Sequence, residues 1–163
     1  MTNNDILRRI RYTFDYNDDQ MIALFAQADH VVNRSEVSNW LKQELESTHV
    51  EMKDVELATF LNGLINDKRG KREGEQPKAE EELNNNIIFR KLKIALNMKD
   101  TDILETLESV DRQISKHELS AFFRKPTQDQ YRPCQNQILR NFLMGLQQKH
   151  RGKVEKEEPK IIK

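Results

Sequence analysis

The chain has 163 residues, of which 27 are basic and 27 acidic, so its formal net charge at pH 7 is zero. This balance excludes a strong overall attraction to nucleic acid or acidic membranes, although it leaves room for local basic patches. No apolar run approaches the ~20 residues that span a bilayer, and the start MTNNDILRR lacks the apolar core of a secretory signal. The single cysteine, Cys134, excludes an internal disulfide, and we expect a cytoplasmic protein.

The start of the chain predicts two amphipathic helices. Their apolar residues recur every three or four positions, which is the spacing of one helix face. These residues are Ile6, Leu7, Ile10 and Phe14 in the first helix, and Met21, Leu24 and Phe25 in the second. Asn4 lies just before the first stripe, so we predict that Asn4 caps the first helix.

A third helix is predicted from a capping box, because Asn33 is followed three residues later by Glu36. The surrounding stretch, VVNRSEVSNWLKQ, is also similar to the turn and second helix of a helix-turn-helix motif. In such motifs, polar residues near the start of the second helix contact bases, and here Arg34 and Asn39 would do so. The alternative is an ordinary capped helix in a bundle, since no glycine marks the turn.

A fourth helix is predicted over the stretch that ends in FLNGLINDKRG, residues 60–70. Lys68, Arg69 and Gly70 are typical of a helix end, because basic side chains favour its negative pole and glycine adopts left-handed backbone. Gly63 lies inside the helix, where glycine costs ~1 kcal/mol relative to alanine. We therefore predict that another helix packs closely against Gly63; the alternative is the close approach of a ligand.

The rest of the chain repeats the first 70 residues. At an offset of 82 residues, about fifteen of the 68 aligned positions are identical without a gap, which indicates a tandem duplication. Residues 3–70 and 85–152 are therefore two homologous units of four helices each. Residues 71–84, KREGEQPKAEEELN, have the composition of a charged linker, and residues 153–163 are expected to be disordered. We predict an all-α protein whose two units pack with pseudo-twofold symmetry.

The duplication also repeats residues with predicted structural roles. The copies of Glu36, Gly63 and Arg69 are Glu118, Gly145 and Arg151. Glu118 would close a second capping box with Ser115, and Gly145 would allow a second close helix crossing. Arg69 and Arg151 stand at helix C-termini, so we expect them to contact helix-end carbonyls or carboxylates.

Another identical pair, Arg8 and Arg90, is explained neither by capping nor by the core. Arg8 points away from the apolar stripe and belongs to a basic cluster with Arg11, which is copied as Arg90 and Lys93. One interpretation is ion pairing within the chain. The other is contact with an anion or a partner, for which the planar guanidinium offers paired donors.

No motif of a catalytic, metal or cofactor site is recognisable, since the histidines are scattered and Cys134 has no CxxC partner. In NNDILRRIRY, FLNGLINDKRG and NNNIIFRKLKIAL the chain resembles the bacterial YehS-like family over both units and the linker. The resemblance implies a bacterial cytoplasmic protein with a domain of unknown function, and it transfers no active site. We therefore expect a non-catalytic helical binding module for a protein or anionic partner, with no cofactor. The alternative is a helix-turn-helix-like nucleic-acid-binding protein.

Overall fold

The computed structural model describes residues 1–152, which form eight α-helices and no strand. The helices are α1 (Asn3–Phe14), α2 (Asp18–Gln27), α3 (Arg34–Leu41), α4 (Asp54–Arg69), α5 (Asn85–Ala95), α6 (Asp100–Glu108), α7 (Lys116–Phe122) and α8 (Asn136–Arg151). The all-α prediction is confirmed for this part of the chain. None of these eight helices has the length and apolar character of a membrane span. The tail over residues 153–163, expected to be disordered, lies outside the described residues.

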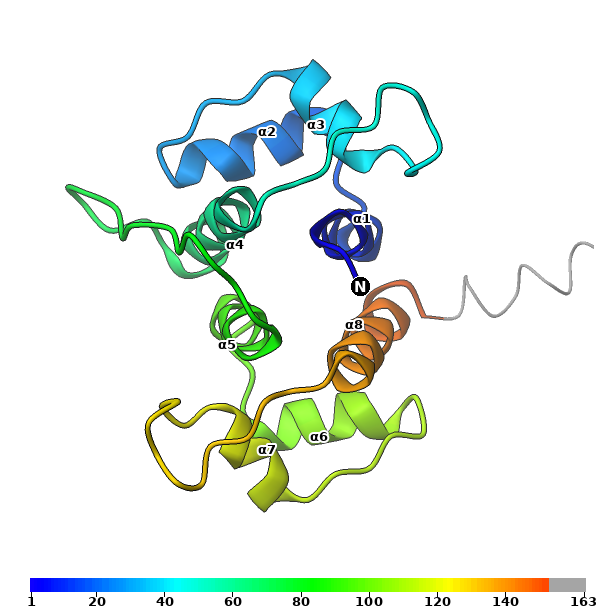
Figure 1. Cartoon of the computed structure of the whole chain (residues 1–163), viewed down its shortest axis with the longest axis vertical. Coiled ribbons are helices and arrows are strands. Elements are labelled where there is room, and N and C mark those ends of the chain that lie inside the picture. Colours follow the sequence, from blue (N-terminus) through cyan, green and yellow to red (C-terminus); the bar gives the residue numbers. More distant parts are fainter. Residues whose placement is uncertain (153–163) are drawn as a thin grey trace, which may run out of the picture.

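The two repeats form two similar units of four helices on opposite sides of the molecule (Figure 1). Unit 1 contains α1–α4 and unit 2 contains α5–α8. In the view of Figure 1, a half-turn about the viewing axis brings α1 towards the place of α5, and α4 towards that of α8. The main contacts between the units are those of α1 with α8 and of α4 with α5. The same half-turn exchanges these two contacts, as expected for a pseudo-twofold arrangement.

The short helices α3 and α7 begin at capping boxes. The Asn33 side chain accepts a hydrogen bond from the backbone N–H of Glu36 (2.8 Å), and the Glu36 carboxylate accepts one from the backbone N–H of Asn33 (3.0 Å). Ser115 and Glu118 make the same two bonds at 3.0 and 2.9 Å. Each box binds backbone N–H groups that would otherwise have no partner at the helix start.

Asn4 does not cap α1, so that prediction is wrong. The N-cap of α1 is Thr2, and the N-cap of α5 is Asn84. Asn4 lies inside the first turn and is buried, as is its copy Asn86. A buried amide needs hydrogen-bond partners, and Asn4 finds them at the end of α3 and in the loop before α4 rather than in its own helix.

These two asparagines join the first helix of each unit to the end of its third helix and to the long loop before its last helix. The Asn4 amide donates to the carbonyls of Trp40 (2.8 Å) and Val50 (2.9 Å), and its oxygen accepts from the backbone N–H of Met52 (2.9 Å). Asn86 makes the corresponding three bonds to Phe122, Arg132 and Cys134. The loop is thereby held against the core at both ends.

The core of each unit is centred on aromatic rings, and beside it two helices cross at a glycine. The rings of Phe25 and Phe60 lie 5.3 Å apart in unit 1, and those of Phe89 and Phe142 lie 4.6 Å apart in unit 2. A methyl group added at Gly63 would collide with the backbone carbonyl of Leu24 in α2. At Gly145 it would collide in the same way with Thr106 in α6. Both glycines therefore allow a close helix crossing, as the packing interpretation predicts.

Candidate functional site

Two hollows lie at positions related by the duplication. The α1 hollow has a volume of about 650 Å³ and lies between α1 and α8; the α5 hollow has a volume of about 230 Å³ and lies beside α5. Residues lining the first include Arg8, Arg9, Tyr12 and Gln147, and their copies Arg90, Lys91, Ile94 and Ile65 line the second. The two hollows can therefore be compared position by position.

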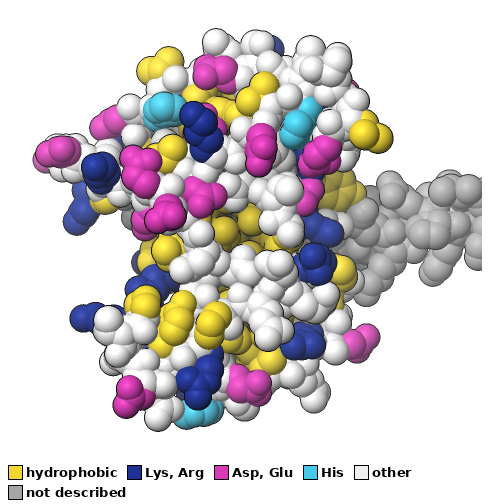
Figure 2. Space-filling view, in the orientation of Figure 1, with side chains coloured by type: hydrophobic (Ala, Val, Ile, Leu, Met, Phe, Trp, Pro, Cys, Tyr) yellow, Lys and Arg dark blue, Asp and Glu magenta, His cyan; other side chains and the backbone are white. Residues whose placement is uncertain are grey.

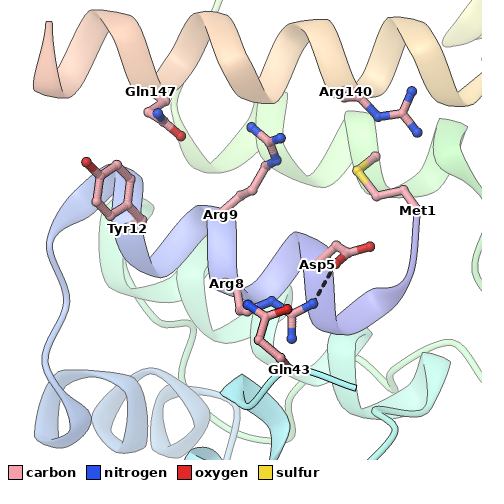
Figure 3. Close-up of a pocket in the computed structure, with 8 residues that line it drawn as sticks. All are labelled: Met1, Asp5, Arg8, Arg9, Tyr12, Gln43, Arg140 and Gln147. Atoms are coloured by element: carbon pink, nitrogen blue, oxygen red, sulfur yellow. Dashed lines mark hydrogen bonds and ion pairs between the residues drawn. The ribbon is translucent and has the colours of Figure 1, made fainter. Parts of the chain in front are cut away.

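In unit 1 the charge of Arg8 is paired within the chain. Its guanidinium donates to the carbonyl of Lys42 (2.8 Å) and to the carboxylates of Asp5 (2.5 Å) and Glu44 (3.1 Å). The contact with Asp5 is drawn in Figure 3, and the Arg8 side chain is 17% exposed. Arg8 therefore fixes the loop after α3 to α1, and the interpretation as an internal ion pair applies to it.

The carboxylates around Arg8 are held in their charged form. Partial burial opposes ionisation of Asp5, but the hydrogen bonds from the Thr2 backbone and from Arg8 outweigh it, so the pKa of Asp5 is lowered. The pKa of Glu44 is also lowered, first by a hydrogen bond from the backbone N–H of Glu44 itself and second by the hydrogen bond from Arg8. Hydrogen bonds to an ionised carboxylate favour the charged form. The Arg8 cluster therefore keeps both its ion pairs at neutral pH.

In unit 2 the same arginine has lost these partners. Asp5 is replaced by Ile87 and Glu44 by Pro126, and both replacements line the α5 hollow. Arg90 is exposed and donates to the backbone carbonyl of Phe123. No carboxylate within residues 1–152 pairs with it. Arg90 therefore carries a charge that the described part of the chain leaves without a counter-ion.

The surroundings of Arg90 combine apolar and basic side chains. Ile94 is 45% exposed, and Tyr131 and Phe122 also line the hollow. Arg124 lies on the same hollow, and its buried Nε has no hydrogen-bond partner in the described part of the chain. On the lower unit in Figure 2, a yellow hydrophobic patch has blue basic side chains around it. This combination suits an anionic group attached to an apolar body.

Lys91, the neighbour of Arg90, is already occupied. Its Nζ contacts the carboxylate of Glu80 in the linker at 3.0 Å and the side-chain oxygen of Asn62 in α4 at 2.6 Å. The linker thus neutralises Lys91 at the edge of the α5 hollow, whereas Arg90 and Arg124 have no carboxylate partner among the described residues.

The other residues of the predicted basic cluster do not gather with Arg8 and Arg90 at one site. Lys93 pairs with Asp100 at 3.2 Å and lies 4.5 Å from the centre of the Phe123 ring. Arg11 is half-buried, and its buried Nε has no partner within the described residues. Arg8 and Arg90 themselves belong to different hollows.

The residues assigned to nucleic-acid contact face their own unit. Arg34 pairs with Asp19 at 2.6 Å and with Asp18 at 3.4 Å, both at the start of α2. The side-chain oxygen of Asn39 accepts a hydrogen bond from Lys42 at 3.1 Å. The start of α3 therefore lies beside carboxylates, which disfavour the approach of DNA phosphates.

The arginines at the ends of α4 and α8 differ from each other. Arg151 donates to the carbonyl of Tyr12 (2.9 Å), lies 4.0 Å from the centre of its ring and is 3.6 Å from the carboxylate of Asp15. It therefore has a structural contact, but with unit 1 rather than with its own helix end. Arg69 is exposed and makes no hydrogen bond or ion pair within residues 1–152, so the structural role expected for it is absent from this part.

Cys134 is buried behind the Asn86 amide, and burial raises the pKa of its thiol to about 12. Such a thiol is protonated at neutral pH and is a poor nucleophile. Within the described residues, no group of three or more His, Cys, Asp or Glu side chains is placed to hold a metal ion.

The repeats also define the relatives of the chain. The family described as "Protein of unknown function (DUF1456)" matches residues 3–70 and again residues 85–152. The chain belongs to this family. The "Uncharacterized protein YehS" of Escherichia coli (strain K12) is 37% identical over 147 residues, which are 90% of this chain and 94% of that protein. No solved structure matches the chain. The resemblance to the YehS-like family is thus confirmed.

In this DUF1456 chain, the sequence does not by itself show that Arg8 and Arg90 have different partners. The difference arises at positions where the two repeats are not identical. With Ile87 and Pro126 at the acid positions, Arg90 has no carboxylate partner within residues 1–152, and Arg124 lies near it on the loop after α7. Identical positions drew attention to Arg8 and Arg90 themselves. What distinguishes Arg90 from Arg8 is the loss of an acid: Pro126 stands where unit 1 has Glu44. This difference can be interpreted only once the structure shows that Glu44 contacts Arg8.

Proposed function

We propose that the protein is a non-catalytic binding module whose α5 hollow receives a segment of a partner protein. The segment carries a carboxylate next to an apolar side chain. The carboxylate pairs with Arg90 and Arg124, and the apolar side chain lies among Ile87, Ile94 and Tyr131, all of which line this hollow.

One observation supports the proposal most directly. Arg8 and Arg90 are copies of the same residue, and in unit 1 that residue contacts two carboxylates, at 2.5 and 3.1 Å. In unit 2 apolar residues occupy both acid positions. A guanidinium hydrogen-bonded to a carboxylate is a strong, oriented pair. A carboxylate from another molecule would restore the pairing that the duplication has removed.

The apolar lining favours a peptide over a small free anion. Arginine and tyrosine are enriched at protein interfaces, where a buried aromatic or aliphatic contact accompanies a directed hydrogen bond. A free carboxylate would pair with Arg90 but leave Ile87 and Ile94 in water. A peptide with both groups would cover the whole hollow.

Unit 1 itself supplies a probe for this site. Glu44, which meets Arg8, is followed by Leu45, whose side chain is fully exposed. The peptide QELEST, residues 43–48 with blocked ends, therefore carries the required chemistry. We expect it to shift the amide NMR signals of the α5 hollow in the full chain. The variant Arg90→Gln should bind it at least about tenfold more weakly, equivalent to ~1.4 kcal/mol.

Two controls make this experiment decisive. The peptide QQLQST lacks the carboxylates and should produce no comparable shifts, and the variant Arg140→Gln removes an arginine from the other hollow and should bind QELEST normally. Equal binding of both peptides, or normal binding to the Arg90→Gln variant, would contradict the proposal. Short duplex DNA in the same titration tests the alternative function: shifts that localise to α3 would favour nucleic-acid binding through Arg34 and Asn39.

A further inference from the structure

The α1 hollow contains two arginines that have no acidic partner within residues 1–152. Arg9 of α1 and Arg140 of α8 both line it, and Figure 3 shows their guanidinium groups beside the space between the two helices. Arg140 donates to the side-chain oxygen of Gln137 at 2.9 Å, and no carboxylate within residues 1–152 pairs with either arginine. Asp5, the acid that lines this hollow, is bound to Arg8.

The duplication provides an internal comparison for this charge. The copy of Arg9 is Lys91, which is 12% exposed and paired with Glu80 of the linker at 3.0 Å. The copy of Arg140 is Ala58, which is buried and uncharged. The α5 hollow thus has one cation at these two positions, with its acid in place. The α1 hollow has two cations at the same positions, and no carboxylate of the described residues pairs with either of them.

We propose that the α1 hollow binds the phosphate groups of a small polyphosphate ligand. Like charges in one hollow repel each other unless an anion lies between them. Two guanidinium groups, one from each side, offer paired N–H donors to the oxygens of a phosphate. The side-chain amides of Gln43 and Gln147 line the same space and add neutral donors. The volume of about 650 Å³ exceeds what a single phosphate fills.

Such a ligand would connect the two units. Arg9 belongs to unit 1 and Arg140 to unit 2, across the contact of α1 with α8. A ligand that binds both residues therefore binds the assembled form and stabilises it by mass action. This prediction is independent of the peptide site, which uses different residues on the other side of the pseudo-twofold axis.

The test is calorimetric titration of the full chain with tripolyphosphate at fixed ionic strength and 20 °C, together with the unfolding temperature. We expect saturable binding at one site and a rise in that temperature. Arg9→Gln and Arg140→Gln should each weaken binding at least about tenfold. Arg90→Gln, with the same charge change in the α5 hollow, should bind tripolyphosphate as the unchanged chain does.

Further titrations identify the ligand class. ATP binding as tightly as tripolyphosphate, with the same dependence on Arg9 and Arg140, would indicate a nucleotide, and ATP binding weakly would indicate an inorganic chain. Citrate carries comparable charge on carboxylates and should bind at least about tenfold more weakly. Equal binding of citrate and tripolyphosphate would overturn the phosphate assignment. Tripolyphosphate binding that Arg9→Gln and Arg140→Gln leave unchanged would overturn the site.

Discussion

At the scale of single residues, one buried amide in each unit determines the path of a long loop. Asn4 is 1% exposed, and its side chain makes three hydrogen bonds to backbone groups of residues 40, 50 and 52. A side-chain amide can serve there because it has both donors and an acceptor. Aspartate has nearly the same shape but, when ionised, accepts only. The position therefore selects asparagine in both units.

Asn4→Asp should lower the free energy of unfolding by ~2 kcal/mol or more. The carboxylate would face the carbonyl oxygens of Trp40 and Val50, which would lose their donor and repel a charge. Urea unfolding of the full chain measures the change. Asn97→Asp is a matched control, because Asn97 is exposed and its copy in unit 1 is Asp15. We expect this control to stay within ~0.5 kcal/mol, and equal effects of the two substitutions would contradict the role assigned to Asn4.

At the scale of helices, features set by neighbouring residues could be predicted from the sequence, whereas contacts between distant residues could not. The capping boxes at Asn33 and Ser115 lie within four residues of chain, so the sequence predicted the starts of α3 and α7. Gly63 and Gly145 indicated close helix crossings because glycine is unfavourable inside a helix. Asn4 was misassigned because its partners are more than thirty residues away, and a polar residue near a helix start has the same local pattern as a cap.

At the helix crossing, packing and helix propensity have opposite effects on the stability of a glycine-to-alanine variant. At an open helix position alanine is better than glycine by ~1 kcal/mol, but at Gly63 a methyl group meets the backbone carbonyl of Leu24. Gly63→Ala should therefore destabilise the protein, by ~2 kcal/mol or more through overpacking, as measured by thermal or urea unfolding. Ala26→Gly in α2, where Ala26 is exposed, gives the reference cost of glycine. A gain in stability for Gly63→Ala would show that α2 and α4 can separate freely.

At the scale of the whole molecule, the duplicated units have diverged in charge. Unit 1 has eight basic and twelve acidic residues, whereas unit 2 has twelve basic and seven acidic residues. The net charge of zero therefore conceals a basic half and an acidic half. The repeat also continues beyond unit 2, since GKVEKEEPK at residues 152–160 matches GKREGEQPK at residues 70–78 in six of nine positions. The duplicated segment thus included the linker sequence.

The same divergence explains why the candidate sites were only partly predictable. The alignment of the repeats identified Arg8 and Arg90, but it gave them one role because their identity was the signal. Asp5 lies three residues from Arg8 and Glu44 lies 36 residues away, so the second partner becomes visible only in the folded chain. Arg9 and Arg140 belong to different units, and their common hollow depends on how the units pack.

The packing of the units leads to a prediction about cooperativity. Each unit of ~68 residues has a small core of its own and gains stability from the shared helix contacts. Across that contact the rings of Phe14 and His150 lie 4.7 Å apart, and Arg151 binds the carbonyl of Tyr12. We therefore expect both units to unfold in a single transition. Trp40, the single tryptophan of the chain, is buried in unit 1 and reports on that unit alone.

Asn86→Asp should therefore shift the urea transition seen by Trp40 fluorescence, although the substitution lies in unit 2. Asn86 makes three hydrogen bonds that correspond to those of Asn4. We therefore expect the free energy of unfolding to fall by ~2 kcal/mol. Because the free energy of unfolding falls by ~1–3 kcal/mol per M urea, the urea concentration at the transition midpoint should fall by roughly 1 M. Helix content measured by circular dichroism should fall at the same midpoint. If the Trp40 transition stays in place while circular dichroism shows an earlier step, the units unfold independently, and the contacts of α1 with α8 and of α4 with α5 are too weak to couple them.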